Sequence, residues 1–285
     1  MKLVTLDYGC GTSSSILDYG IEDVVVISEK NYEHIFEIED NLLFIGHDFL
    51  FFLWDTEEKL KKWNLRKDKW EHWVWCFERI DAIVPAWMKK SHYSLTLANT
   101  FCNRIIACDE DDCNKYGFDW LPQWASIKFF AKRDVEPTRK EMLFSGQAGK
   151  PEYKTRTDLI NNILSDESTS DMLHVSNISR DLGWDAYIEN FLEHSMVLNP
   201  VGVLKALNTR AYETLYSNRI LLQQTIGKYE RHEKLLGNLS NVVFFENFEQ
   251  LKYKLEEKKE RAFEDEAYYS HNIFSRMKSI GLDVK

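Results

Sequence analysis

Strand-length runs of apolar residues alternate with helix-length segments along the whole chain, and this alternation constrains the fold more than any other feature. It is typical of an α/β fold with parallel strands, because a parallel pair needs a crossover that a helix supplies. In the second half we predict strands at 142–145, 172–175, 196–198, 220–223 and 242–245. Helices are expected between them near 155–164, 184–193, 209–217 and 232–239. This succession predicts one Rossmann-like unit.

The first half repeats this pattern less regularly. Strands are expected at 3–7, 24–27, 42–45, 73–77 and 105–108. The charged stretch 131–140 contains Pro137 and few apolar residues, so we place the join between two domains there. We therefore predict two Rossmann-like domains facing a central cleft. The first covers 1–135 and the second 136–262, and a helix in 263–285 packs back on the first domain.

Composition excludes several classes of protein. The formal net charge of −10 argues against non-specific coating of nucleic acid, which needs a surplus of Lys and Arg. The longest apolar stretch, 42–54, is interrupted by His47 and Asp48, so we expect neither membrane insertion nor a signal peptide. The 5 cysteines are scattered and without paired ligand spacing, which favours reduced thiols and a cytoplasmic protein.

The loop after the first expected strand, DYGCGTSS, allows two interpretations. Its glycines, Gly9 and Gly11, with an acidic residue after the next strand, resemble the cofactor loop of an S-adenosylmethionine-dependent methyltransferase. However, Ser13 stands where a further glycine is common, and the second five-strand unit exceeds a single methyltransferase sheet. We therefore favour the loop, with Thr12 and Ser13, as the first strand-to-helix turn of the first, acceptor-side domain. There we expect it to line the cleft and to help orient the sugar acceptor.

The region 198–224 carries the most chemical information. A strand ends at Asn199, and a helix is expected to begin after Asn208, a good N-cap residue. Arg210 falls in the first turn and Glu213 lies three residues later on nearly the same face. A guanidinium suits phosphate oxygens and a carboxylate suits ribose hydroxyls. The same spacing also occurs in ordinary surface ion pairs.

The segment LNTRAYETLYSNRILLQQ resembles the donor-site segment of GT-B glycosyltransferases, especially the group that includes the spore maturation protein CgeB. The pattern N-x-R-x-F-E-x-L-x-x-G-x-x-L-L recurs there, and Asn218 stands where glycine is usual. Asparagine is tolerable if that position needs a left-handed backbone. The stretch around Gly146, Lys154 and Arg156 resembles the opening of the family's donor domain. The segment HNIFSRM resembles its final crossing helix.

The resemblance implies transfer of a hexose or pentose from a nucleoside diphosphate sugar, of the UDP type, to an acceptor hydroxyl. It implies that Glu213 binds the ribose, with Gly146, Lys154, Arg156, Asn199, Asn208 and Arg210 around the rest of the donor. Neither a cofactor nor a metal is then expected. The acidic run DEDD at 109–112 falls at an expected helix start, where carboxylates are stabilising without a metal.

The catalytic base and the acceptor are less constrained. Asp48 and Glu78 follow apolar strands of the first domain and are our candidates for a base or an acceptor-orienting residue, with His47 as a further possibility. The acceptor is a glycan or protein, or hydroxymethylated bases in DNA. For DNA, the basic segment 59–75, with its four tryptophans, would supply phosphate contacts and stacking surfaces. The alternative is an amphipathic helix whose tryptophans pack inward. A non-catalytic sugar-nucleotide-binding protein also remains open.

Overall fold

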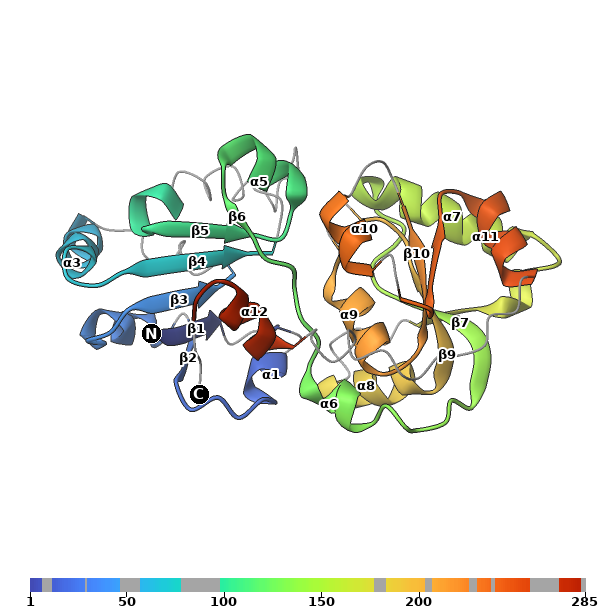
Figure 1. Cartoon of the computed structure of the whole chain (residues 1–285), viewed down its shortest axis with the longest axis horizontal. Helices are drawn as coiled ribbons and strands as arrows, with labels where there is room; N and C mark the ends of the chain where they lie inside the picture. Colours follow the sequence, from blue (N-terminus) through green and yellow to red (C-terminus); the bar gives the residue numbers. More distant parts are fainter. Residues whose placement is uncertain are drawn as a thin grey trace. The chain divides into compact units, whose positions relative to one another are not determined.

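The chain forms two compact units in a computed structural model. It describes residues 1–6, 12–28, 30–46, 57–77, 98–176, 183–202, 207–225, 230–236, 239–256 and 272–282. One unit comprises Met1–Pro122 and Met277–Lys285, and the other Gln123–Arg276. Each has its own parallel sheet, as predicted from the alternation of strands and helices (Figure 1). We describe each unit by itself.

The first unit is built on a six-stranded sheet of order β2-β1-β3-β4-β5-β6. Its strands are β1 (Lys2–Leu6), β2 (Val24–Ile27), β3 (Leu42–Ile45), β4 (His72–Cys76), β5 (Arg104–Ala107) and β6 (Asp119–Trp120). Helices α1 (Thr12–Leu17), α3 (Glu57–Lys67) and α5 (Glu110–Tyr116) accompany them. The first five strands lie within one residue of their predicted limits. The two-residue β6 was not predicted, because it is too short to produce a periodic signal.

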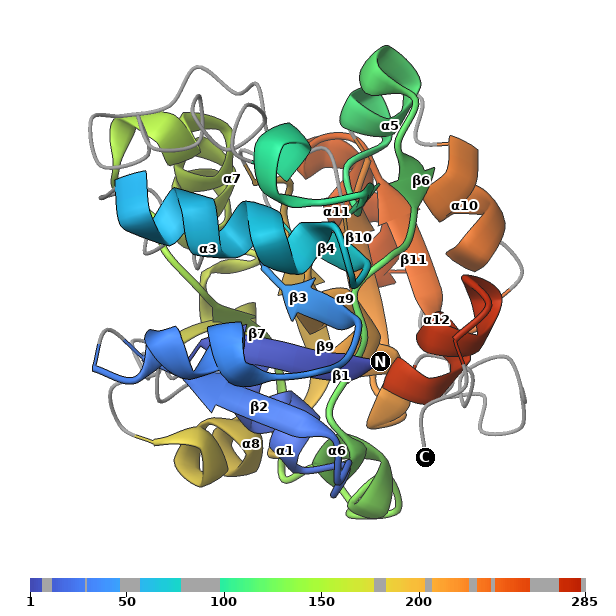
Figure 2. The ribbon, with the colours of Figure 1, turned by 90° about the vertical axis from the view of Figure 1, so that its left-hand side faces the viewer.

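Helix α3 carries the basic segment, and its tryptophan packs inward. Trp63 is fully buried in the core, and its ring N–H donates to the carbonyl of Phe101 at 2.9 Å. Trp75, on β4, is equally buried and donates to the carbonyl of Leu121 at 3.0 Å. Lys62 lies on the exposed side of α3, where it pairs with Glu58. Figure 2 shows α3 lying across the sheet. Up to Lys67 the segment is thus the amphipathic helix that we considered as the alternative to a stacking surface, and from His72 on it belongs to strand β4. Trp70 and Trp73 are half-buried.

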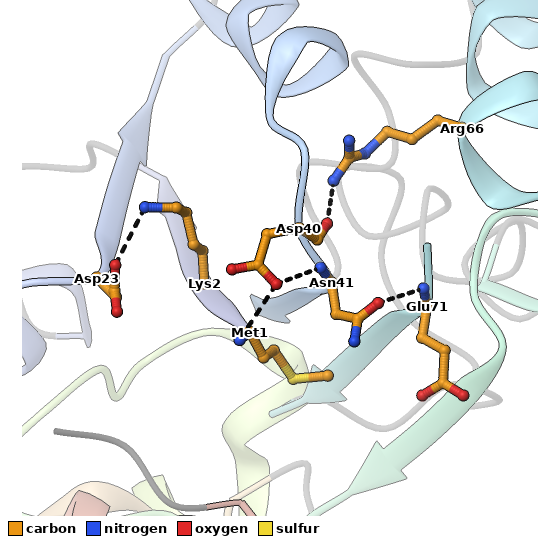
Figure 3. Close-up of polar contacts among 7 residues, drawn as sticks. All are labelled: Met1, Lys2, Asp23, Asp40, Asn41, Arg66 and Glu71. Carbon is orange, nitrogen blue, oxygen red and sulfur yellow. Dashed lines mark hydrogen bonds and ion pairs between the residues drawn. The ribbon is translucent and has the colours of Figure 1, made fainter. Parts of the chain in front are cut away.

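The amino ends of β1, β3 and β4 are tied together by the residues in Figure 3. The Asp40 carboxylate lies 3.3 Å from the Met1 amino group, and Arg66 donates to the Asp40 carbonyl. The Asn41 side chain accepts from the backbone N–H of Glu71 at 2.7 Å. These contacts hold the amino edge of the sheet. Ligands of parallel α/β sheets bind at the opposite, carboxyl edge.

The acidic run at 109–112 begins α5, as expected. The Asp109 side chain accepts from the backbone N–H groups of Asp111 at 2.9 Å and Asp112 at 3.1 Å. It is therefore the N-cap of the helix, and Gly117 ends the helix in the left-handed conformation. These carboxylates have a structural explanation in helix capping and the helix dipole.

His72, the first residue of β4, makes the stability of the protein depend on pH. Its ring is fully buried and lies 4.4 Å from the Trp63 ring, centroid to centroid. Burial, with the nearby Arg66 and Lys67, lowers the pKa of His72 from 6.5 to about 4. Protonation in the folded state is therefore disfavoured relative to the unfolded chain.

We expect the free energy of unfolding to be highest above pH 6.5 and to fall by about 3 kcal/mol as the pH drops to 4, through His72 alone. Urea unfolding at pH 7.5, 6.0, 5.0 and 4.5 should follow this loss. His72→Phe should reduce the slope without removing it, because burial also lowers the pKa of His194. An unchanged slope in the variant would show that His72 carries no such linkage.

The second unit contains a five-stranded sheet of order β11-β10-β9-β7-β8. Its strands are β7 (Arg139–Ser145), β8 (Leu173–Ser176), β9 (His194–Asn199), β10 (Ile220–Gln224) and β11 (Val242–Phe245). The helices are α6 (Ile127–Ala131), α7 (Lys154–Ser165), α8 (Trp184–Leu192), α9 (Thr209–Tyr216), α10 (Glu230–Leu236) and α11 (Phe248–Glu256). Helix α12 (Ile273–Ser279) begins in this unit and ends in the first. All the strands and helices predicted in this half are present, with shifted ends.

Two apolar layers cover the faces of this sheet. Leu143 and Val197 point into the layer formed with α8 and α9, while their neighbours Phe144 and Leu198 point into the layer formed with α7 and α11. This alternation is the period of two expected of strands buried on both faces. Phe129 of α6 packs in the first layer, 5.1 Å from the Phe191 ring. The compact units consequently divide at Pro122 and Gln123, earlier than the stretch 131–140 in which we expected the join.

The end of α9 explains the asparagine at the usual glycine position. Asn218 has φ of 60°, as expected if this position requires a left-handed backbone. Its N–H donates to the carbonyl of Leu215 at 3.0 Å, and the N–H of Arg219 donates to that of Thr214 at 2.9 Å. These two bonds form a Schellman motif, which ends the helix and turns the chain into β10.

Candidate functional site

The candidate site lies at the carboxyl end of the second sheet, where β7 and β9 end and α9 begins. Asn199, the last residue of β9, is 2% exposed and donates through its side-chain amide to Gln223 of β10 at 2.7 Å. Arg210, in the first turn of α9, donates through Nη1 to the Asn199 side-chain oxygen at 3.0 Å. The buried asparagine thus fixes the guanidinium at the strand ends.

Gly146 directly follows β7, and the Arg210 guanidinium lies against it. A Cβ atom at position 146 would stand 2.5 Å from Arg210 Nη2, closer than any ordinary contact. Glycine at position 146 therefore leaves the space that the Arg210 guanidinium occupies. Glycine, asparagine and arginine from three separate positions in the sequence, all predicted for the donor site, are in this way brought together.

Arg156 adds a second guanidinium to this region. It lies in the first turn of α7, is 7% exposed, and donates through Nη1 to the backbone carbonyl of Gln147 at 2.8 Å. Its Cζ stands 5.9 Å from the centre of the Phe144 ring, and the Cζ of Arg210 stands 5.5 Å from the same ring. Phe144 therefore serves as an aromatic support for both cations.

The charge of Arg156 is not balanced by a carboxylate among the described residues, since its partners are the Gln147 carbonyl and the Phe144 and Tyr153 rings. Its Nε is buried without a hydrogen-bond partner in the same part of the chain. Burial, and next the neighbouring Arg210, lower the pKa of Arg156 to about 10. A buried cation beside a half-buried one is suited to binding an anion that carries more than one negative charge.

Glu213 lies one turn after Arg210 on α9 and is 4% exposed. Its Oε2 accepts a hydrogen bond from the hydroxyl of Tyr187, on α8, at 2.7 Å. The Tyr187 ring stacks on that of Trp184, with centroids 5.5 Å apart and an angle of 16°. Sequence reasoning missed both aromatic residues, because nothing in their spacing separates them from core residues of α8.

The remaining predicted donor residues differ in exposure. Lys154 is exposed and lines a hollow beside α7 with Gly149, Lys150, Pro151, Thr157 and Asp158. Asn208 directly precedes α9 as predicted, but its side chain makes no capping hydrogen bond. Its Oδ1 is buried without a partner in the described part of the chain. Arg276, expected in the final crossing helix, lies in α12 and stacks on Tyr212 with Cζ 5.2 Å from the ring.

The predicted catalytic residues Asp48 and Glu78 lie outside the described residues, as do His47, Gly9 and Gly11 of the first unit. Thr12 and Ser13 begin helix α1, but their side chains are not described. The roles that we assigned to these positions stay predictions. Within the described ranges, three or more His, Cys, Asp or Glu side chains nowhere gather in a way that could hold a metal ion. In the same ranges, every helix is too short or too polar to cross a membrane.

Comparison with known proteins shows the fold of this chain. No family model matches it, and no curated protein matches its sequence. Crystal structures of Anabaena Alr3699/HepE in complex with UDP, with UDP and glucose, and with UDP-glucose each align with a TM-score of 0.53. Each alignment has 10% sequence identity and covers 98% of this chain and 94% of HepE. At this identity the likeness is one of fold, over nearly the full length of both chains.

Proposed function

We propose that this protein is a glycosyltransferase that takes its sugar from a UDP-type nucleoside diphosphate sugar. The observation that carries the proposal is that the guanidinium groups of Arg156 and Arg210 both lie near the Phe144 ring, and that Arg210 lies against a glycine without room for a side chain. HepE, which shares the fold, has been crystallised with UDP and UDP-glucose. A diphosphate carries enough negative charge to form charge-assisted hydrogen bonds with both neighbouring guanidinium groups.

The chemistry follows from where charge develops. As the bond between sugar and diphosphate breaks, negative charge grows on the leaving phosphate oxygens. Arg156 is buried and Arg210 is half-buried and held by Asn199, so both are in place before the reaction and stabilise the transition state more than the ground state. We therefore propose transfer of a hexose or pentose without a metal ion or cofactor.

The donor contacts that we propose are divided by chemistry. Arg156, Arg210 and Lys154 face the phosphates, Gly146 allows their close approach, and Glu213 binds the ribose. Asn199 holds Arg210, and Asn208 places the start of α9 beside the donor. Asp48 and Glu78 stay our candidates for the base that activates the acceptor. We also propose the domain limits 1–135, 136–262 and 263–285, with a cleft between the first two domains and a C-terminal helix that returns to the first. We further propose that the protein is related to the CgeB-like group of glycosyltransferases.

For the acceptor we propose a hydroxyl of a glycan or protein in preference to hydroxymethylated DNA. A DNA acceptor needs aromatic side chains that stack on bases. Of the four tryptophans in 59–75, Trp63 and Trp75 are fully buried and hydrogen-bonded to backbone carbonyls, so neither is available for stacking. The other two are half-buried, and Arg104 lies over the Trp73 ring with Cζ 4.3 Å from its centre. Transfer assays that compare hydroxymethylated DNA with simple glycosides test this preference. Transfer to DNA alone would reverse it.

Thermal unfolding with candidate ligands tests the donor class directly. A ligand that binds only the folded state raises the melting temperature, by an amount that grows with the logarithm of the ratio of ligand concentration to Kd. We expect UDP and UDP-glucose at 1 mM to raise it by several degrees, and S-adenosylmethionine to leave it unchanged. Stabilisation by S-adenosylmethionine alone would replace the proposal with a methyltransferase.

Gly146→Ala provides a variant specific to the site. The new methyl group would clash only with the far end of the Arg210 side chain, since Phe144 Cζ would stand at an ordinary contact distance of 3.5 Å, so the guanidinium should move while the fold is retained. We expect a UDP affinity about tenfold lower and a melting temperature without ligand within about 2 °C of the wild type. Gly149→Ala is not a suitable control, because φ at Gly149 is 84° and any side chain is strained there. Ser145→Ala, one residue earlier in β7, is the matched control.

A further inference from the structure

The hydroxyl of Tyr187 makes a contact that the proposed chemistry does not yet use. It donates to Oε2 of Glu213 at 2.7 Å and thereby joins α8 to α9. The Glu213 carboxylate is 4% exposed. A buried carboxylate needs hydrogen-bond donors, and a donor that is itself fixed determines the plane in which the carboxylate lies.

The ring that carries this hydroxyl is held by aromatic neighbours. Trp184 stacks on it at 5.5 Å, with an angle of 16° between the rings. The Phe129 ring stands edge-on to it at 6.3 Å and 79°, and the Phe191 ring lies 5.9 Å away. A phenol held by three rings cannot swing away without breaking this cluster. The position of the Tyr187 hydroxyl is therefore fixed by the packing of its ring.

The Glu213 end of this contact lies on the helix that carries Arg210, where we propose that the donor nucleotide binds. Glu213 begins the second turn of α9, whose first turn holds Arg210 against Asn199 and Gly146. A carboxylate that accepts from ribose hydroxyls must be oriented before the ligand arrives, because reorientation on binding costs affinity. Two acceptor oxygens with several lone pairs can serve a phenol and a ribose together.

We propose that Tyr187 is a positioning residue that orients Glu213 for the ribose of the donor nucleotide. It acts through the carboxylate and does not itself contact the phosphates. The proposal rests on the proposed function, since it assumes that a ribose is bound at Glu213. It predicts selectivity for ribose hydroxyls as the measurable consequence, which a role in packing alone would not produce.

Tyr187→Phe removes the hydroxyl and keeps the ring, and calorimetric titration with three probes tests the proposal. We expect the affinity for UDP to fall about tenfold. The affinities for 2′,3′-dideoxyuridine diphosphate and for inorganic pyrophosphate should change less than twofold, because neither probe offers a ribose hydroxyl. Glu213→Gln should show the same pattern, and the double variant should lose no more than the larger single loss.

Tyr253→Phe, an exposed tyrosine on α11 with 59% of its surface accessible, is the control and should leave all three affinities unchanged. Equal losses for all three probes in Tyr187→Phe would assign the residue to packing and overturn the inference. Unchanged UDP affinity would also overturn it, while leaving the proposed function intact. Failure of the wild-type protein to bind UDP would instead reject the proposed function, and this inference with it.

Discussion

Arg156→Met is expected to abolish UDP binding while leaving the ligand-free protein at least as stable as the wild type. The two effects have opposite signs for one physical reason. Arg156 is a buried cation beside Arg210 and without a carboxylate partner among the described residues, so its charge costs folding energy. Methionine keeps the apolar stem and removes the charge. In the proposed complex the diphosphate pairs with that charge in the wild type, and the variant offers the diphosphate no cation at this position.

We expect UDP affinity to fall at least about 100-fold, since charge-assisted hydrogen bonds to phosphate contribute about 1.5 to 3 kcal/mol each. Titration calorimetry gives the affinity, and urea unfolding without ligand gives the stability. Arg133→Met is the control, because Arg133 lies over the Phe130 ring away from the strand ends and should affect neither quantity by much. A large loss of stability in Arg156→Met, with UDP affinity retained, would contradict the assignment of Arg156 to an anion site.

Arg219→Met is expected to lower the free energy of unfolding by about 3 kcal/mol or more. Arg219 is fully buried and donates to the backbone carbonyls of Ser217, Val135 and Leu192 at 2.7 to 2.8 Å. Leu192 ends α8 and Ser217 caps the end of α9, so the cation lies at the negative ends of two helices. Removing it leaves buried carbonyls without a donor, each of which costs about 1 to 3 kcal/mol.

Urea unfolding measures this loss. Lys128→Met is the matched control, because the exposed ion pair of Lys128 with Asp185 should contribute less than 1 kcal/mol. If Arg219→Met unfolds at the same urea concentration as the wild type, the three carbonyls must be satisfied by other donors, and Arg219 would not hold the connection between the helices and residue 135.

The sequence predicted elements well where a single physical signal decides them. β10, with ILLQQ between a helix end and charged residues, follows from an apolar run of strand length. α9 begins after Asn208 at the predicted place, although the Asn208 side chain makes no capping hydrogen bond, and the left-handed Asn218 follows from its place at a helix end. β6 was missed because two residues carry no period.

The candidate site was predicted only in part. Arg210 and Glu213 lie three residues apart on one helix, so their common location follows from helix geometry alone. The contacts of Arg210 with Asn199 and Gly146, and of Tyr187 with Glu213, join residues 11 to 64 positions apart. No local pattern encodes which of many polar side chains meet across such separations.

The alternation of strands and helices, and the residue types at the ends of the strands, were determined by the sequence itself. The tertiary structure alone decided that two guanidinium groups share one aromatic ring and that a phenol holds the buried carboxylate, because such contacts depend on how strands and helices pack in three dimensions.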